Sequence, residues 1–142
     1  MMSLEQKQQL TQPKEPLQCK ENKRYTLFPL RDQKEKIIFS YFQKHVSTLW
    51  TVEELRLGPQ DRIDYESFPP NVQLFLSNVL AFFASADTLI IDNLMSNFCF
   101  EINHTVVQAF YAIQSAIEAI HSQAYSSLLD LLVRDEKEKN KL

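Results

Sequence analysis

Glycine and proline, the residues that most often interrupt helices and strands, are confined to the first half of this chain. The 142 residues include one glycine, Gly58, and six prolines, the last of which is Pro70. From Asn71 onward neither residue occurs, which favours long helices over sheets with tight turns. At this length the chain is expected to form at most one domain with its own core. We therefore predict an all-α fold.

Apolar residues at helical spacing predict the individual helices. The pattern over residues 33–47 predicts a first, amphipathic helix. Phe68-Pro69-Pro70 is a typical helix entry, and the helix that follows is expected to extend to about Asn97, apolar on several faces and buried. A turn is expected over residues 97–103, before a third helix over residues 103–134. The two long helices are predicted to be antiparallel and to form half of a four-helix bundle.

The beginning of the chain differs in composition from the rest. Residues 1–21 are rich in Gln, Lys, Glu and Pro. Such a segment cannot bury enough apolar surface to offset the entropy of ordering it, so we expect a disordered tail. Residues 22–142 are expected to form the folded part, and they begin with an extended segment that ends at Pro29.

A short segment between the first two predicted helices carries helix-capping residues. Thr51 and Glu54 have the spacing of a capping box, which predicts a new helical turn. Gly58-Pro59 is expected to end that turn. A polar loop is then expected through Asp64.

Charge and cysteine content exclude several classes of protein. The formal charge of −3 gives no basic surface for nucleic acid. Cys19 and Cys99 are far apart and form no CxxC motif, so neither a disulfide framework nor a cysteine metal site is expected, and a reducing cytoplasmic location fits. The N-terminus has no apolar signal region, and Asp87 interrupts the most apolar run, residues 79–91. We expect a soluble cytoplasmic protein without a membrane span.

Three side chains of different chemistry share one face of the third predicted helix. Glu118, His121 and Tyr125 are spaced i, i+3 and i+7, which places them on one narrow face. Their Ala, Ile and Leu neighbours indicate that this face points inward. A Glu-x-x-His pair on an inward helical face is the ligand unit of di-iron and di-manganese carboxylate centres in bundles. Carboxylate and imidazole donors suit iron or manganese better than zinc.

Asp87 is a carboxylate within the apolar run of the second predicted helix. A buried carboxylate is costly unless it is paired, protonated or bound to a metal. Asp87 lies level with Glu118 and His121 if the two helices are offset by about one turn. The residues alone leave alternatives open, because Asp87 can be bonded to a neighbouring helix and His121 can be a core histidine. Tyr125 is equally a core tyrosine or one oxidised by a nearby metal, and Trp50 is a packing anchor.

Longer segments, in order and at consistent spacing, carry more information than single residues. They are Asn22-Lys-Arg-Tyr-Thr-Leu-Phe-Pro-Leu, Leu49-Trp-Thr-Val-Glu-Glu, Phe75-Leu-Ser-Asn-Val-Leu-Ala-Phe-Phe-Ala-Ser-Ala-Asp87 and Ile117-Glu-Ala-Ile-His-Ser-Gln-Ala-Tyr-Ser-Ser-Leu. Together they resemble the small (beta) subunit of class I ribonucleotide reductase, of the eukaryotic and viral kind, over residues 22–142. The resemblance implies a ferritin-like helical bundle, here incomplete, with two long antiparallel helices and a shorter N-terminal helix.

The resemblance also implies a role for each candidate residue. Asp87, Glu118 and His121 would ligate one iron of an oxo-bridged di-iron site, and manganese is an alternative metal. Tyr125 would hold a stable radical, formed with O₂. Trp50 would lie on the electron-transfer route to the large subunit, which reduces ribonucleoside diphosphates to deoxyribonucleotides for DNA synthesis. The intact small subunit is expected to be a homodimer.

Two residues differ from the family pattern, and the chain is also much shorter than the family requires. Thr88 and Gln123 stand where the family usually has glycine and glutamate. The family needs a second half with three further iron ligands, so we expect a truncated chain that is inactive alone. Two alternatives are a non-catalytic helical fragment that associates with an intact small subunit or a complementing half, and another ferritin-like carboxylate protein. Half a bundle exposes apolar surface, so self-association is expected.

Overall fold

The computed structural model describes residues 25–133 and 139 of the chain, and every regular element in this part is helical. This confirms the predicted all-α class. The elements, in order, are α2 (Gln33–Ser47), the short 3₁₀ helix η3 (Val52–Leu55), α3 (Pro59–Ser67), α4 (Pro70–Asn93), the π-helical turn η4 (Leu94–Phe98), α5 (Cys99–Glu101) and α6 (Thr105–Leu132). The predicted tail, residues 1–21, lies outside the described residues.

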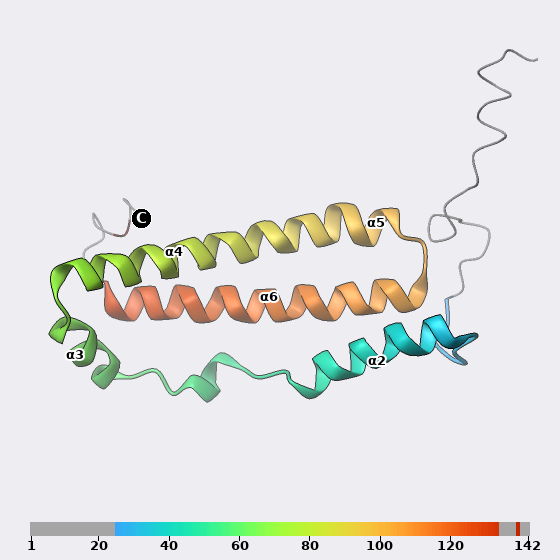
Figure 1. Ribbon diagram of the computed structural model, residues 1–142, viewed down its shortest axis with the longest axis horizontal. Coiled ribbons are helices and arrows are strands. Elements are labelled where there is room, and N and C mark those ends of the chain that lie inside the picture. The colour runs from blue at the N-terminus through green and yellow to red at the C-terminus, as the bar shows by residue number, and fades with distance from the viewer. Residues whose placement is uncertain (1–24, 134–138, 140–142) are drawn as a thin grey trace, which may run out of the picture.

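Helix α6 lies at the centre of the arrangement. It packs antiparallel along α4 on one side, and α2 lies along its other side (Figure 1). Helix α3 contacts α6 as well and leads directly into α4. The predicted αα-hairpin of two long helices with a shorter N-terminal helix is therefore confirmed. Helices α4 and α6 supply the three metal-ligating residues predicted from the sequence.

Local capping explains where α2 begins. Asp32 is its N-cap, and its Oδ1 accepts a hydrogen bond from the backbone N–H of Glu35 at 2.9 Å. This bond lowers the pKa of Asp32 below its ordinary value of 3.8, because it stabilises the charged carboxylate. The helix covers the predicted residues 33–47. Thr51 begins the predicted turn, η3, where the carboxylate of Glu54 accepts from the N–H of Thr51 at 3.1 Å.

The polar loop expected after Gly58 is wrong, because this segment forms helix α3. Pro59 occupies its first position, where a missing N–H costs nothing. The carboxylate of Asp61 accepts a hydrogen bond from the Gly58 N–H at 2.7 Å, so the helix start is capped. An i,i+4 ion pair, Arg62 with Glu66 at 2.7 Å, supports the same helix. The Gly-Pro pair, which is typical of loops, therefore begins a helix here.

The turn expected over residues 97–103 is also wrong in its position. The helical path continues past Asn93 through η4 and α5 to Glu101, so the connection to α6 is only residues 102–104. The side chain of Gln108 donates to the backbone carbonyls of Cys99 at 3.0 Å and Ile102 at 2.8 Å. The side-chain amide of Gln108 therefore bonds backbone carbonyls at the end of α5. In many helices the N–H groups of a C-terminal glycine motif bond these carbonyls instead.

Helix α4 is not buried as predicted. Its buried residues are the polar Ser77 and Asp87, whereas Phe75, Phe82 and Leu89 are largely exposed. By length and composition the stretch Pro70–Glu101 could also cross a membrane, contrary to the sequence-based expectation. The core helices of water-soluble bundles meet the same criterion. These apolar side chains of α4 are therefore left uncovered by the other residues that the structure describes.

Candidate metal centre

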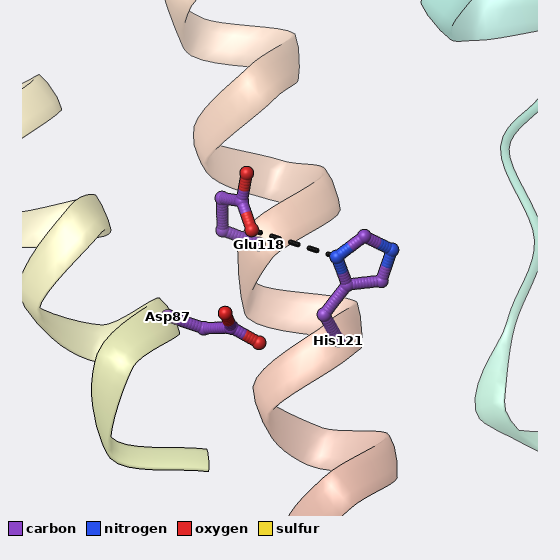
Figure 2. A group of neighbouring side chains, drawn as sticks. All are labelled: Asp87, Glu118 and His121. Atoms are coloured by element: carbon purple, nitrogen blue, oxygen red, sulfur yellow. Dashed lines mark ion pairs between the residues drawn. The ribbon is translucent and has the colours of Figure 1, made fainter. Parts of the chain in front are cut away.

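Three metal-ligating side chains meet between α4 and α6. Asp87 comes from α4, and Glu118 and His121 come from α6 (Figure 2). One potential ligand atom from each lies within 4.8 Å of the other two. Glu118 Oε2 and His121 Nδ1 are 3.5 Å apart, as expected for residues one helical turn apart. In the part of the chain that the structure describes, this is the one such group of three or more.

The position of the interhelical connection explains why these residues lie level. Asp87 is fifteen residues before Ile102, and Glu118 is fourteen residues after His104. The two helices therefore need no offset, contrary to the sequence-based expectation, because the true turn lies later than the predicted one. A hydrogen bond from Ser122 Oγ to the Ala84 carbonyl, at 3.0 Å, joins the helices beside the group.

Asp87 has the environment of a metal ligand. Its side chain is 5% exposed, and its Oδ2 has no hydrogen-bond partner among the described residues. An unpartnered carboxylate oxygen in an apolar interior is costly, and a cation removes that cost. The alternative in which the neighbouring helix hydrogen-bonds this oxygen finds no support. Two carboxylates and one imidazole form a donor set that suits iron or manganese.

The rings of the other two candidate residues lie near His121. The centroid of the Trp50 ring is 5.7 Å from that of the His121 ring, and the centroid of the Tyr125 ring is 6.4 Å from it. Tyr125 also stacks on Phe83 of α4 at 5.3 Å. A cavity of about 350 Å³ opens beside Trp50 and His121, and His45 lines it too. The structure therefore brings all five sequence-predicted residues together.

The other two histidines lie outside this group. His45 packs edge-on against Phe110, and its Nδ1 is 2.9 Å from the Tyr41 carbonyl oxygen. His104 Nε2 is 3.4 Å from Glu35, a carboxylate that is 4% exposed. Helical spacing predicts no buried carboxylate partner for His104. This partner is on a different helix, α2, which helical periodicity cannot reveal.

Comparison with known proteins matches the chain to one family. The sequence profile of the family "Ribonucleotide reductase, small chain" matches residues 24–142. The chain belongs to the ribonucleotide reductase small-chain family. Among curated relatives, the ribonucleoside-diphosphate reductase small chain of Variola virus is 38% identical over 128 residues, and a ribonucleoside-diphosphate reductase small chain of Arabidopsis thaliana is equally identical over the same length. These alignments cover 90% of this chain, but 39% and 36% of the relatives.

A solved structure supports the fold independently. The ribonucleotide reductase Rnr4 homodimer from Saccharomyces cerevisiae matches with a TM-score of 0.71 at 27% sequence identity. The match covers 82% of this chain and 36% of the yeast protein. The predicted ferritin-like small-subunit fold is therefore confirmed over part of its length. The chain spans less than two fifths of the proteins that it matches.

Proposed function

We propose that this chain carries the first half of the metal and radical site of a ribonucleoside-diphosphate reductase small subunit. The observation that carries the proposal is the buried Asp87 carboxylate, whose Oδ2 has no hydrogen-bond partner among the described residues and which lies beside Glu118 and His121. The two neighbouring rings, Trp50 and Tyr125, support it. The whole protein would support the conversion of ribonucleotides to deoxyribonucleotides as DNA precursors.

Asp87, Glu118 and His121 would hold one iron, or manganese, of a di-iron site. Bound iron supplies, together with O₂, the oxidising power for removing one electron from a nearby phenol. The helices supply the geometry, because two of the ligands share one face of α6 and the third is buried on α4. Glu118 Oε2 lies 3.5 Å from His121 Nδ1, so these two donor atoms lie next to each other on the same face of α6.

Tyr125 is the residue that we propose to be oxidised. Oxidation of Tyr125 to a neutral tyrosyl radical would remove one electron from the phenol ring, and the proton of the hydroxyl oxygen would leave with it to a base at the site. Stacking on Phe83 keeps one ring face away from water. Such shielding lengthens the lifetime of a radical because it excludes small reductants.

Trp50 is the residue that we propose as the link toward the large subunit. Its ring lies against His121, so an electron can pass between the site and the surface segment that carries η3. In this scheme the large subunit binds the ribonucleoside diphosphate and the small subunit is a homodimer in the cytoplasm. The small subunit contributes the radical.

The chain alone is proposed to be inactive, because the described residues gather only three metal ligands. This observation also favours a second candidate function. In that alternative the chain is a non-catalytic helical fragment that associates with an intact small subunit or with a complementing half. It would then take up no metal of its own.

Electron paramagnetic resonance distinguishes these functions. The chain is supplied with Fe(II) and O₂ alone, and then together with a polypeptide that contains the second half of a related small subunit. We expect a tyrosyl signal only in the mixture. A mixture prepared with the Tyr125→Phe variant of this chain should give no such signal. Association without iron uptake would support the non-catalytic fragment, and a stable signal from the chain alone would refute the proposed incompleteness.

A further inference from the structure

Two side-chain hydroxyl groups meet at one backbone carbonyl where α4 and α6 pack together. Ser122 Oγ, on α6, donates a hydrogen bond to the Ala84 carbonyl of α4 at 3.0 Å. Thr88 Oγ1, on α4, donates to the same carbonyl at 3.2 Å and lies 3.4 Å from Ser122 Oγ. The Ala84 carbonyl therefore binds a hydroxyl from each of the two helices. We call these three residues the hydroxyl cluster.

The hydroxyl cluster lies directly beside the candidate metal ligands. Ser122 follows His121 in the chain, and Thr88 follows Asp87. Ala84 is three residues, about one helical turn, before Asp87. Figure 2 shows Asp87 on the part of α4 that lies next to the turns of α6 carrying the other two ligands. A shift of α4 along α6 at the cluster would therefore also shift Asp87 relative to those ligands.

A directional bond constrains the register of two helices more than apolar contacts do. Hydrophobic attraction is non-directional, whereas a hydrogen bond requires a defined distance and angle between its atoms. A shift by one residue moves one helix about 1.5 Å along the other. Such a shift would break the bond from Ser122 to the Ala84 carbonyl. We propose that the hydroxyl cluster fixes the register of α4 on α6, and that Ser122 and Thr88 are positioning residues for Asp87.

Asp87 needs such support while the chain is free of metal. Its Oδ2 has no hydrogen-bond partner among the described residues, so this oxygen does not hold the side chain in place. A metal site requires its ligands within about 0.5 Å of the productive geometry. The cluster holds the backbone of α4 beside Asp87. Glycine, the residue that the family usually has in place of Thr88, has no hydroxyl and could make neither of the two Thr88 contacts.

The consequence of this inference for metal binding rests on the proposed function, but the register itself can be measured without metal. Spin labels are attached at Leu89→Cys on α4 and Ser126→Cys on α6, two exposed positions, in a Cys19→Ser/Cys99→Ser background. Pulsed electron paramagnetic resonance then gives the distance between the labels. The labelled chain is diluted with unlabelled chain, so that only distances within one chain contribute. We expect one narrow distance distribution, and a broader or shifted one when Ser122→Ala is added.

Titration with Mn(II) measures the effect on metal binding. The chain is mixed with the second-half polypeptide described above, and the loss of the resonance signal of free Mn(II) reports binding. Ser122→Ala should weaken binding by about tenfold or more, because residues behind metal ligands typically contribute about 10–100-fold. Ser115→Ala is the matched control, since this hydroxyl of α6 donates within its own helix, to the Tyr111 carbonyl at 3.0 Å. Its Mn(II) affinity should stay close to that of the wild type.

Substitutions at Thr88 distinguish the hydroxyl from the shape of the side chain. Thr88→Val keeps the shape and removes the hydroxyl, whereas Thr88→Ser keeps the hydroxyl. Thr88→Val should broaden the label distances and weaken Mn(II) binding, by a smaller factor than Ser122→Ala because the bond from Thr88 to Ala84 stays within α4. Thr88→Ser should behave like the wild type in both measurements. Circular dichroism checks that each variant keeps its helix content.

Three results would overturn the proposal. They are label distances that Ser122→Ala leaves unchanged, an equal loss of Mn(II) affinity in Ser115→Ala and Ser122→Ala, and a Thr88→Ser variant that behaves like Thr88→Val. A different result separates this inference from the proposed function. If the wild-type mixture binds no Mn(II) while the label distances still respond to Ser122→Ala, the metal function is refuted and the role of the cluster in the register is supported.

Discussion

The two faces of α4 differ in the side chains that they bury and expose. The face toward the rest of the molecule buries Ser77 and Asp87, whereas the outer face exposes Phe75, Phe82 and Leu89. In a helix of an ordinary monomer the apolar stripe faces the core. The inner face of α4 therefore combines half-buried apolar residues, such as Leu80 and Ile91, with two buried polar side chains. The outer face carries apolar side chains that the other described residues leave uncovered.

The two buried polar side chains of the inner face differ in their hydrogen bonding. Near the start of α4, Ser77 donates to the Gln73 carbonyl at 2.9 Å, and its Oγ lies 2.7 Å from the Tyr65 hydroxyl oxygen. Ten residues later Asp87 leaves its Oδ2 without a partner among residues 25–133 and 139. A satisfied buried polar group stabilises a fold, but an unsatisfied one destabilises it. This difference supports the proposal that Asp87, and not Ser77, is a metal ligand.

Replacing Asp87 should produce the largest effect, and in two opposite directions. Asp87→Leu removes a buried carboxylate oxygen, Oδ2, that has no partner among the described residues, so the metal-free chain should become more stable by about 1–3 kcal/mol. In the complemented protein the same change should weaken iron binding by more than about a hundredfold, since even residues behind the ligands cost 10–100-fold. Urea denaturation and iron titration measure the two effects. A destabilised metal-free variant would show that Asp87 has a structural partner.

Replacing Ser77 should have the opposite sign. Ser77→Ala removes a hydrogen bond between α3 and α4 and should destabilise the chain by about 1 kcal/mol. Tyr65→Phe should cost a similar amount, because the Tyr65 hydroxyl also donates to the Gln73 carbonyl at 3.1 Å. The double variant should cost less than the two single losses added together, because both residues share one contact. Additive losses in urea denaturation would mean that the two hydroxyls act separately.

The same contrast separates what the sequence could predict from what it could not. Helical spacing within α6 is enough to place Glu118, His121 and Tyr125 on one face, and the apolar surroundings of Asp87 are enough to predict its burial. Both are properties of neighbouring residues in the chain. The exposure of Phe75, Phe82 and Leu89 could not be predicted, because an apolar pattern does not specify which of its side chains the rest of the chain covers. The pairing of Glu35 with His104 could not be predicted because it joins two helices.

Variants on the outer face should leave the stability of the monomer almost unchanged. Leu89→Gln replaces a side chain that is 70% exposed, so the free energy of unfolding should change by less than about 0.5 kcal/mol at concentrations where the chain is monomeric. At higher concentration the wild type should become more stable than the variant, because only the wild type gains from association. Thermal denaturation at two protein concentrations measures this. Equal stabilities of wild type and variant at both concentrations would show that Leu89 takes no part in self-association.

The smallest effect should come from the exposed, satisfied carboxylate of Asp32, the counterpart of the buried Asp87. Its pKa lies below 3.8 because the Glu35 N–H donates to its charged form. A lowered pKa in the folded state means that its stabilisation is present above pH 3.8 and is lost as the pH falls through the folded-state value. Asp32→Ala should therefore lower Tm at neutral pH, and the difference from wild type should shrink in acid. Asp32→Asn keeps a hydrogen-bond acceptor for the N-terminus of α2 but removes the charge. At neutral pH its Tm should therefore be closer to that of the wild type than the Tm of Asp32→Ala is, and the comparison distinguishes the effect of the hydrogen bond from that of the charge. A loss of Tm that is equal at neutral and acid pH would mean that the cap does not depend on ionisation.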